Sequence, residues 1–284
     1  MVADERIHPT AVVDPRAALG ARVRVGAFAV VSAEASLGDD VEIGHHAIVE
    51  GRVTLGAGVK IGAGAILGSR PQDLKFKSET PSGVRIGAGT VVREYVVIHR
   101  ATAPDGWTEI GRQCLVMAMS HVAHECRLGD GVVVINYAGI TGHCVIGDRA
   151  TIGGLSGMVP FTRVGPLAYV GGLSRVVADV PPYMMVVGQP ATVRSVNVIG
   201  LRRAGMAPAD RRLLQDAHRI LYREGLSPRR AVERIREELP ATPPIVTLLD
   251  FIAEARRGIC GPPGHDDEAG LAVSGRPGDT GGED

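Results

Sequence analysis

The sequence predicts an all-β parallel β-helix followed by a small α-helical domain, and three observations support this fold class. Aliphatic residues recur at every sixth position over most of the first 176 residues. Glycine is abundant, with 38 residues among 284, whereas aromatic residues make up only 4%. In the last third of the chain the period of six is lost, and apolar residues recur at helical spacing. A period of six fits neither a helix nor a hairpin sheet, so short strands joined by tight turns explain the first part best.

The repeat begins close to the N-terminus. Glycine often follows the aliphatic slot, and a small residue such as Ala29 or Val41 stands four places after it. We expect the aliphatic residue to fill the interior, glycine to turn the corner and the small residue to fit the narrow part of the cross-section. The first eleven slots are Ile7, Val13, Leu19, Val25, Val31, Leu37, Ile43, Val49, Leu55, Ile61 and Leu67.

The register breaks twice. It is lost over residues 69–85, and a loop is predicted at 99–109. It then continues from Ile110 to Val176. Within this part Cys114, Cys126 and Cys144 all fall in the small inward position. We therefore expect buried thiols there, and neither a cysteine nucleophile nor a disulfide.

The C-terminal part of the β-helix leads into helical sequence. The stretch 179–193 contains a proline-marked exit and a last extended segment. Helices are predicted at 208–224, from Ser227-Pro228 onward, and at 244–257. These limits divide the chain into a β-helix domain (1–192), a helical domain (193–260) and a disordered tail (261–284). The helical domain would cover the open end of the β-helix.

Charge and hydropathy exclude several classes of function. The 31 basic and 31 acidic residues cancel, so bulk charge does not call for a nucleic-acid partner. No apolar run reaches the ~18 residues of a membrane span. The N-terminal stretch MVADERIHPT has no signal-peptide core. We therefore expect a cytoplasmic protein with reduced cysteines.

The repeat also places polar residues next to one another. Three repeats make one coil, so residues eighteen apart should stack at about 4.8 Å. This places His124 beside Gly142, and Glu125 beside His143. It also places His121 beside Gly139. The sequence therefore predicts two imidazoles, a carboxylate and an unhindered glycine backbone on one patch.

Two chemistries use such a patch. A neutral histidine can act as a general base that activates a hydroxyl or amine for attack on an acyl carbonyl, while a backbone N–H stabilises the oxyanion. Alternatively, imidazoles can hold a zinc ion and its bound water. The spacing alone does not choose between them.

The ordered set of segments beyond the repeat resembles one family. These segments are PQDLKF (71–76), REYVVIHRAT (93–102), SHVAHECRLGD (120–130), GITGHCVIGD (139–148), DVPPY (179–183) and VNVIGLRRAG (196–205). In this order they resemble the acyl-[acyl carrier protein]–UDP-N-acetylglucosamine O-acyltransferases of lipid A synthesis, over about residues 7–258. The resemblance implies a left-handed β-helix of hexapeptide repeats and a homotrimer with active sites between subunits. It implies no metal and no bound cofactor.

The resemblance also assigns residues. His124 matches the general base that deprotonates the glucosamine 3-hydroxyl, which then attacks an (R)-3-hydroxyacyl carrier-protein thioester. Glu125 stands where the family usually has Asp, and Gly142 matches the oxyanion donor. The remaining matched positions line the substrate site: Gln72, Asp73 and Lys75 in the first loop, His99, His121 and His143 around the base, Gly172 by the acyl groove, and Asn197 and Arg203 near the uridine diphosphate.

Five residues depart from the family pattern. Val159-Pro160 replaces His-Gln, while Pro190, Ile199 and Ala204 replace His, Glu and Arg. Since the base and oxyanion positions are intact, we expect acyl transfer with altered substrate preference, for example toward a sugar with a 3-amino group. The alternatives are a hexapeptide acyltransferase with another donor or acceptor, a zinc hydro-lyase of the carbonic anhydrase type, and a non-catalytic scaffold.

Overall fold

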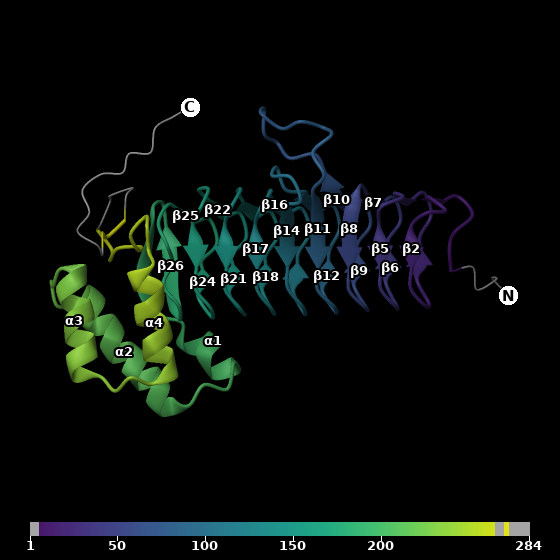
Figure 1. The fold of residues 1–284 in the computed structure, drawn as a ribbon. Helices are drawn as coiled ribbons and strands as arrows, with labels where there is room; N and C mark the ends of the chain where they lie inside the picture. The colour runs from purple at the N-terminus through teal and green to yellow at the C-terminus, as the bar shows by residue number, and fades with distance from the viewer. Residues whose placement is uncertain (1–5, 265–269, 273–284) are drawn as a thin grey trace.

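In the part of the chain that the structure describes, the protein is a long β-helix with four helices gathered at its C-terminal end (Figure 1). The computed structural model describes residues 6–264 and 270–272. Short strands, parallel except for the last, form three sheets of nine, eight and ten strands, here called sheets I, II and III. Consecutive strands of the coil visit the three sheets in turn, which confirms the predicted fold class.

The strand bounds follow the period of six. Sheet I contains β1 (Val12–Val13), β4 (Val30–Val31), β7 (Ile48–Val49), β10 (Ile66–Ser69), β13 (Val97–His99), β16 (His121–Val122), β19 (Gly139–Ile140), β22 (Gly157–Met158) and β25 (Arg175–Val176). Sheet II contains β2 (Ala18–Leu19), β5 (Ser36–Leu37), β8 (Arg52–Leu55), β11 (Gly83–Ile86), β14 (Trp107–Ile110), β17 (Arg127–Leu128), β20 (Val145–Ile146) and β23 (Arg163–Val164). Sheet III contains β3 (Arg24–Val25), β6 (Glu42–Ile43), β9 (Lys60–Ile61), β12 (Val91–Val92), β15 (Leu115–Val116), β18 (Val133–Val134), β21 (Thr151–Ile152), β24 (Tyr169–Val170), β26 (Met184–Gly188) and β27 (Ala191–Val196).

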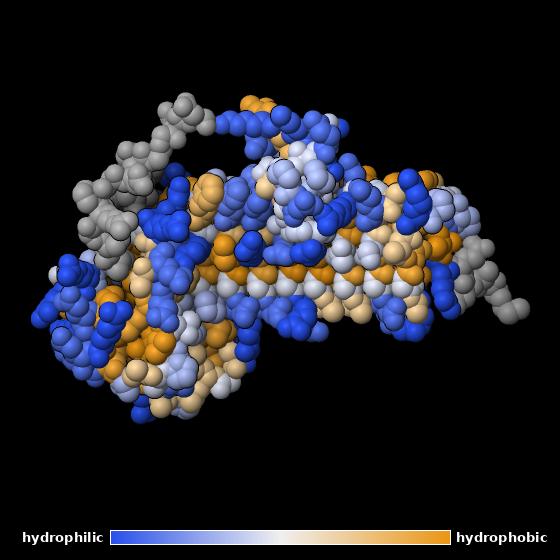
Figure 2. Space-filling model, viewed as in Figure 1, coloured by the Kyte–Doolittle hydropathy of each residue, from blue (hydrophilic) through white to orange (hydrophobic). Residues whose placement is uncertain are grey.

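The aliphatic slots form the core, as predicted, except at the first coil. Val31, Val49 and Leu67 are at most 1% exposed. On the surface, rows of residues of similar hydropathy run along the rod (Figure 2). In contrast, Ile7 and Leu19 are 41% and 37% exposed. Among the described residues, the first coil pairs with a neighbouring coil on one side only, so its aliphatic side chains are partly exposed. The prediction that every slot fills the interior is therefore wrong for this coil.

The three repeat cysteines occupy the small inward position. Cys114, Cys126 and Cys144 are free and at most 2% exposed. Cys126 donates to the backbone oxygen of Thr141, at 3.0 Å. These contacts confirm the prediction that the thiols are buried and unpaired by disulfides.

Both breaks in the repeat open at the same corner of the triangle, between sheet I and sheet II. An uninterrupted coil of eighteen residues would pair Leu55 with residue 73. Leu55 pairs instead with Ile86, because the first insert lengthens this coil. In the same way, an uninterrupted coil would pair Val97 with residue 115, but Val97 pairs with His121 because of the second insert. The first insert, residues 70–82, projects from the rod beside β10 (Figure 1). The second insert, residues 100–106, lies one coil further on.

The C-terminal end closes sheet III and then turns helical. Strands β26 and β27 form an antiparallel pair on β24. The predicted helices are found as α2 (Pro208–Tyr222), α3 (Pro228–Glu238) and α4 (Pro243–Ala253). A six-residue helix, α1 (Val198–Arg203), was not predicted. None of the helices in the described part of the chain is long and apolar enough to cross a membrane.

The predicted tail, residues 261–284, is described only at 261–264 and 270–272. Gly261 accepts a hydrogen bond from the Val193 N–H, at 2.8 Å. Leu271 and Ile259 exchange two backbone hydrogen bonds of 2.8 and 3.0 Å. The remaining tail positions lie outside the described residues. The predicted boundary between residues 192 and 193 falls inside β27.

Candidate active site

The polar residues predicted to converge lie on the corner that carries both inserts, which we call the histidine corner. It consists of the turns between sheets I and II at residues 123–126, 141–144 and 159–162, together with the two inserts. Glu125, His143 and Phe161 occupy the same left-handed position of successive turns, with φ of 54°, 62° and 64°. Because the backbone conformation repeats, the three side chains leave the rod in the same direction, one coil apart.

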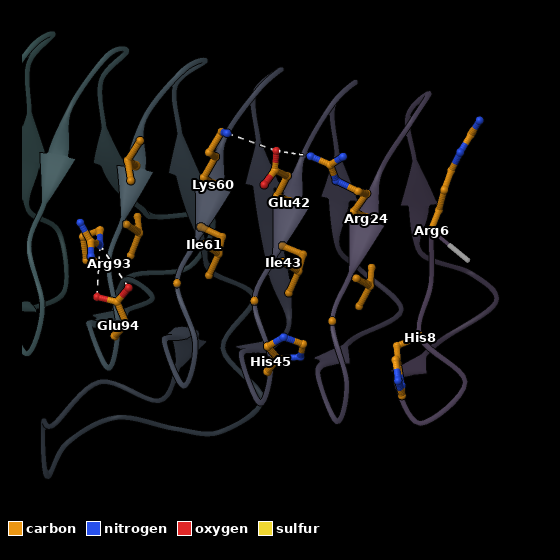
Figure 3. Close-up of a pocket in the computed structure, with 16 residues that line it drawn as sticks. Arg6, His8, Arg24, Glu42, Ile43, His45, Lys60, Ile61, Arg93 and Glu94 are labelled. Carbon is orange, nitrogen blue, oxygen red and sulfur yellow. Dashed lines mark hydrogen bonds and ion pairs between the residues drawn. The ribbon is translucent and has the colours of Figure 1, made fainter. Parts of the chain in front are cut away.

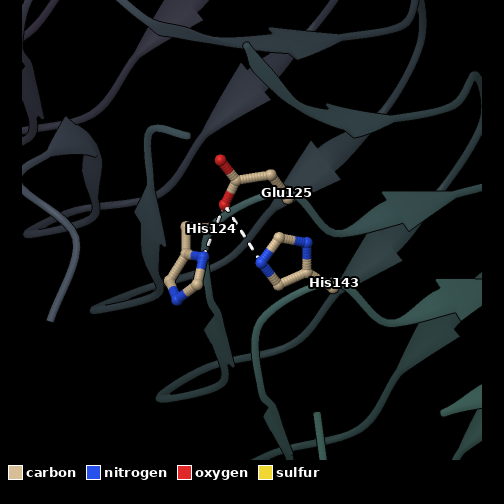
Figure 4. Close-up of side chains that lie close together, drawn as sticks. All are labelled: His124, Glu125 and His143. Atoms are coloured by element: carbon tan, nitrogen blue, oxygen red, sulfur yellow. Dashed lines mark hydrogen bonds and ion pairs between the residues drawn. The ribbon is translucent and has the colours of Figure 1, made fainter. Parts of the chain in front are cut away.

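The centre of the site is a hydrogen-bonded pair of His124 and Glu125 (Figure 4). The His124 Nδ1 lies 2.5 Å from the Glu125 Oε2. Both side chains are mostly buried, with 18% and 15% exposed. Since an ionised carboxylate only accepts, Nδ1 carries the proton and Nε2 of a neutral His124 keeps a free lone pair. This is the tautomer that a general base requires.

The second carboxylate oxygen of Glu125 is bound by the insert at 100–106. Glu125 Oε1 accepts hydrogen bonds from the Thr102 N–H at 2.5 Å, from Thr102 Oγ1 at 2.8 Å and from the Ala103 N–H at 2.9 Å. Burial alone would raise the pKa of the Glu125 carboxyl, but these bonds and the one from His124 outweigh it and lower the pKa below its ordinary value.

His143 completes the cluster from the next coil. Its Nε2 lies 3.9 Å from the Glu125 Oε2, and its ring meets the His124 ring edge-on at 5.3 Å (Figure 4). The other side of the His143 ring stacks on Phe161, with centroids 4.5 Å apart and an interplanar angle of 10°. Phe161 thus fixes the plane of the His143 ring.

A second histidine pair lies beside the first, toward sheet I. The His121 Nε2 and the His99 Nδ1 are 3.2 Å apart, and only 4% of His99 is exposed. Burial, followed by the positive charges that His121 and His124 could carry, lowers the pKa of His99 to about 4. The same effects of burial and of His124 lower the pKa of His121. Both imidazoles are therefore neutral near pH 7.

Gly142 lies directly against the ring of His124. A Cβ atom at this position would be 2.4 Å from the His124 Cε1 and 2.7 Å from its Nε2, so any side chain would displace the His124 ring. Within the described part of the chain, the Gly142 N–H donates to no other group. Gly142 therefore offers an unused donor next to the free nitrogen of His124.

The first insert presents its predicted site residues to solvent. Gln72 and Lys75 are exposed and Asp73 is half-buried. The Asp73 Oδ1 accepts a hydrogen bond from the Lys75 N–H at 2.8 Å, which shapes the turn. Between them Leu74 is fully exposed. Among the described residues of one chain, no hydrogen bond or ion pair joins this insert to the His124–Glu125 pair.

Three predicted site residues lie on other corners. Gly172 is in a turn between sheets III and I. Asn197 binds the Leu167 oxygen, in a turn between sheets II and III, and its side chain also caps α1 by accepting from the Gly200 N–H. Arg203 is exposed at the end of α1. A single chain thus does not bring Asn197 and Arg203 to His124.

The residues that depart from the family pattern also lie on different parts of the molecule. Val159 and Pro160 are on the histidine corner, one coil beyond Thr141 and Gly142. Ile199 is 59% exposed on α1, and Ala204 ends that helix. Pro190 is in the tight turn between β26 and β27. Only Val159 and Pro160 can therefore change the surroundings of His124 within one chain.

Sequence reasoning did not single out two groups that complete the site. Thr102 and Ala103 have no fixed place in a period of six because they belong to an insert. Phe161 could have been found, because it stands eighteen residues after His143 in an unbroken part of the repeat.

The described residues also offer a possible metal-binding cluster and a charged groove. The ligand atoms of His124, Glu125 and His143 lie within 4.8 Å of one another, which is close enough to hold a metal ion after small shifts. A groove on sheet III near the N-terminus is lined by charged residues (Figure 3). In it, Glu42 Oε1 pairs with Arg24 at 2.6 Å and with Lys60 at 3.2 Å. This ladder joins three coils and is a structural feature.

Comparison with known proteins agrees with the fold. The model of the bacterial transferase hexapeptide (six repeats) matches residues 34–69, and that of UDP-N-acetylglucosamine O-acyltransferase domain 2 matches residues 179–260. Among solved structures, the UDP-N-acetylglucosamine acyltransferase of Bacteroides fragilis is 36% identical with a TM-score of 0.86, and covers 89% of this chain and 98% of its own. The Acinetobacter baumannii enzyme is 33% identical with a TM-score of 0.86, over 90% and 100%.

Curated relatives give the same result at the level of sequence. The acyl-[acyl-carrier-protein]–UDP-N-acetylglucosamine O-acyltransferase of Ralstonia nicotianae is 50% identical over 266 residues, covering 90% of this chain and 98% of the relative. The protein of that name from Thermodesulfovibrio yellowstonii is 39% identical over 255 residues, covering 89% and 98%. With a left-handed β-helix of matching length and these relatives, the chain belongs to the acyl-[acyl-carrier-protein]–UDP-N-acetylglucosamine O-acyltransferase family.

Proposed function

We propose that this enzyme transfers an (R)-3-hydroxyacyl group from acyl carrier protein to the 3-position of UDP-N-acetylglucosamine, the first step of lipid A synthesis. The observation that carries the proposal is the His124–Glu125 pair, which leaves a free imidazole nitrogen beside the unused N–H of Gly142. The names of the relatives supply the donor and the acceptor.

In the proposed reaction, His124 Nε2 takes the proton from the sugar 3-hydroxyl as its oxygen attacks the thioester carbonyl. The charge of the resulting oxyanion is stabilised by the Gly142 N–H. Glu125 stabilises the imidazolium that forms on His124. The tetrahedral intermediate then collapses, the C–S bond breaks, and His124 returns its proton to the leaving thiolate. The ester and the free carrier-protein thiol are the products.

The remaining predicted residues bind substrate in this proposal. His121, His143 and His99 line the sugar side, and the neutral states of His99 and His121 suit hydrogen bonding to a sugar. Gly172 borders the acyl chain, since a residue without a side chain leaves room there. Gln72, Asp73 and Lys75 contact the nucleotide sugar. Asn197 and Arg203 act near the uridine diphosphate, where a guanidinium suits phosphate.

A homotrimer would bring these residues together, since Asn197 and Arg203 lie on a different corner from His124. The turns between sheets III and I, which we call the apolar corner, offer a contact surface. Five side chains in left-handed positions of successive turns are 48–61% exposed there: Tyr95, Met119, Tyr137, Leu155 and Leu173. Such a continuous apolar row is typical of a protein–protein interface. A closed threefold arrangement would cover it in every subunit.

The protein is proposed to act in the cytoplasm, where carrier-protein thioesters and nucleotide sugars are made. It needs no nucleic-acid partner and no bound cofactor in this mechanism, because every proton and charge is handled by His124, Glu125 and Gly142.

The deciding experiment measures thiol release from (R)-3-hydroxyacyl carrier proteins of several chain lengths, with UDP-N-acetylglucosamine as acceptor. Release that depends on the acceptor, together with mass-spectrometric detection of the 3-O-acyl product, supports the proposal. Failure to release thiol at any chain length would refute it.

A second candidate differs in the acceptor atom. Val159 and Pro160 stand next to the His124–Gly142 pair, where the family usually has His-Gln, so the sugar-binding surface is altered. A UDP-sugar with a 3-amino group, assayed in parallel, tests whether an amide forms faster than the ester.

Metal analysis and a carbon dioxide hydration assay test the zinc alternative, since His124, Glu125 and His143 are close enough to bind an ion.

A further inference from the structure

The insert at 100–106 replaces the turn of the histidine corner one coil before His124 and Glu125. It is fixed to the rod and to the first insert by several hydrogen bonds. Ser82 Oγ donates to the Ala101 oxygen at 2.5 Å, and the Asp105 N–H donates to the Pro81 oxygen at 2.6 Å. Arg100 reaches the Ser78 oxygen at 3.1 Å. The two inserts therefore form one unit above the site.

Within this unit, three donors converge on one oxygen of Glu125. They are the N–H groups of Thr102 and Ala103 and the hydroxyl of Thr102. The other oxygen, Oε2, binds His124. The two oxygens of the carboxylate thus have separate roles, because Oε1 is anchored to the insert while Oε2 orients the imidazole.

A glutamate needs this anchor more than a shorter carboxylate does. Its side chain has three rotatable bonds, and holding it in one rotamer costs conformational entropy. An ionised carboxylate that is half-buried also needs partners for its lone pairs. Thr102 supplies two of the three donors to Oε1, one from its backbone and one from its side chain.

We propose that Thr102 is a positioning residue of the acyl transfer reaction: its hydroxyl holds Glu125 in the orientation that fixes the tautomer and plane of His124. The inference rests on the proposed function, because it assumes that His124 is the base. Thr102 itself contacts no reacting atom. Its effect on the rate passes through Glu125.

Two conservative substitutions and one matched control test this role. Thr102→Val keeps the shape and removes the hydroxyl, whereas Thr102→Ser keeps the hydroxyl and removes the methyl group. The control is Thr108→Val, because Thr108 is fully buried in the adjacent strand β14 and its hydroxyl has no hydrogen-bond partner among the described residues. Assays use the full chain with the carrier-protein thioester and the nucleotide sugar.

We expect Thr102→Val to lower kcat about tenfold, which is the effect of losing one hydrogen bond to a charged group while two backbone bonds remain. KM for both substrates should stay within twofold, since Thr102 binds neither. Thr102→Ser should restore most of kcat, and Thr108→Val should leave kcat unchanged. A loss of kcat in Thr102→Ser equal to that in Thr102→Val would overturn the role of the hydroxyl.

The pH profile provides a readout that a purely structural role would not move. The rate should fall at acidic pH, because a proton on either member of the His124–Glu125 pair removes the arrangement that accepts the sugar proton. The groups facing Glu125 are His124, His143, Thr102 and Ala103. Removing the Thr102 hydroxyl removes a bond that favours the ionised form, so the acidic limb of kcat should move to higher pH. An unmoved limb would argue against the proposal.

A double-mutant comparison separates this inference from the proposed function. In a Glu125→Gln background, Thr102→Val should cause less than a twofold further loss, because its effect passes through the carboxylate. An equal tenfold loss in both backgrounds would overturn the inference. If the wild-type enzyme releases thiol and Thr102→Val matches it, this inference fails alone. If the wild-type enzyme releases none, the proposed function itself fails.

Discussion

The histidine corner and the apolar corner have the same backbone and carry different chemistry. Glu125 and His143 on the first have φ of 54° and 62°, and Met119 and Tyr137 on the second have φ of 60° and 62°. On the histidine corner the Glu125 side chain is mostly buried and hydrogen-bonded to His124, and it lies 3.9 Å from the partly exposed His143. On the apolar corner the side chains point into solvent. The difference comes from the two inserts, which cover only the histidine corner and supply donors for a buried carboxylate.

The comparison teaches that the turn conformation of this scaffold does not encode a site. It gives each coil one outward side chain per corner, at a fixed spacing, and tolerates nearly any residue there. A site arises where an insert shields that side chain from water and satisfies its polar atoms. The following predictions test this view, from the largest expected effect to the smallest.

Replacing His124 should have the largest effect. His124→Ala removes the proposed base, so kcat should fall by about 10²-fold or more. The matched control is His46→Ala, because His46 is an exposed histidine in a left-handed turn position of the corner between sheets III and I. Its kcat should be unchanged. Thiol-release kinetics and circular dichroism of both variants provide the measurement, and equal rates for His124→Ala and wild type would contradict the assignment.

Gly142 should be the next most sensitive position. In Gly142→Ala the new methyl group would lie 2.4 Å from the His124 Cε1, so the ring must move. A displacement of about 1 Å costs on the order of 10²-fold in rate. Gly139→Ala is the control, because a Cβ there meets nothing within 4 Å. We expect similar unfolding midpoints for the two variants and a lower kcat only for Gly142→Ala.

Charged substitutions on the apolar corner should weaken the association of subunits. Leu155→Glu and Leu173→Glu place charges on the proposed subunit interface. Each buried leucine contributes about 1.5–3 kcal/mol, so each substitution should weaken association at least tenfold. Analytical ultracentrifugation at micromolar concentration should then show smaller species than wild type. Activity should fall together with assembly, since neighbouring chains would complete each site. An unchanged sedimentation profile would show that this corner is not the interface.

The smallest effect concerns the dependence of stability on pH. Burial lowers the pKa of His99 from 6.5 to about 4, so the unfolded chain binds more protons than the folded chain between these values. This part of the stability is complete above pH 6.5 and is lost as pH falls toward 4. At pH 5 the loss should be about 2 kcal/mol. Urea unfolding of wild type and His99→Gln at pH 7 and pH 5 checks this, because the variant should lose less.

The repeat explains which parts of the molecule could be predicted from sequence. A period of six is sufficient to place Glu125 against His143 and His124 against Gly142, because each coil adds a fixed step. Thr102 could not be placed in this way, since an insert has no register. The capping role of Asn197 was also missed, because helix α1 is six residues long and gives little periodic signal. The apolar corner could have been found from the sequence, since its exposed residues share one position of the repeat.

The coils of the β-helix stack at a fixed spacing, so a binding groove that runs along the rod could lengthen only by whole coils. Gly172 lies three rungs beyond the rung of His121, as counted along sheet I from β16 to β25. Each rung adds about 4.8 Å, so the backbone offers only whole steps of that size. Finer adjustment must come from the side chains that line a rung. If Gly172 borders the acyl chain as proposed, a bound chain is therefore measured in steps of one rung, and single residues such as Gly172 set the length between these steps.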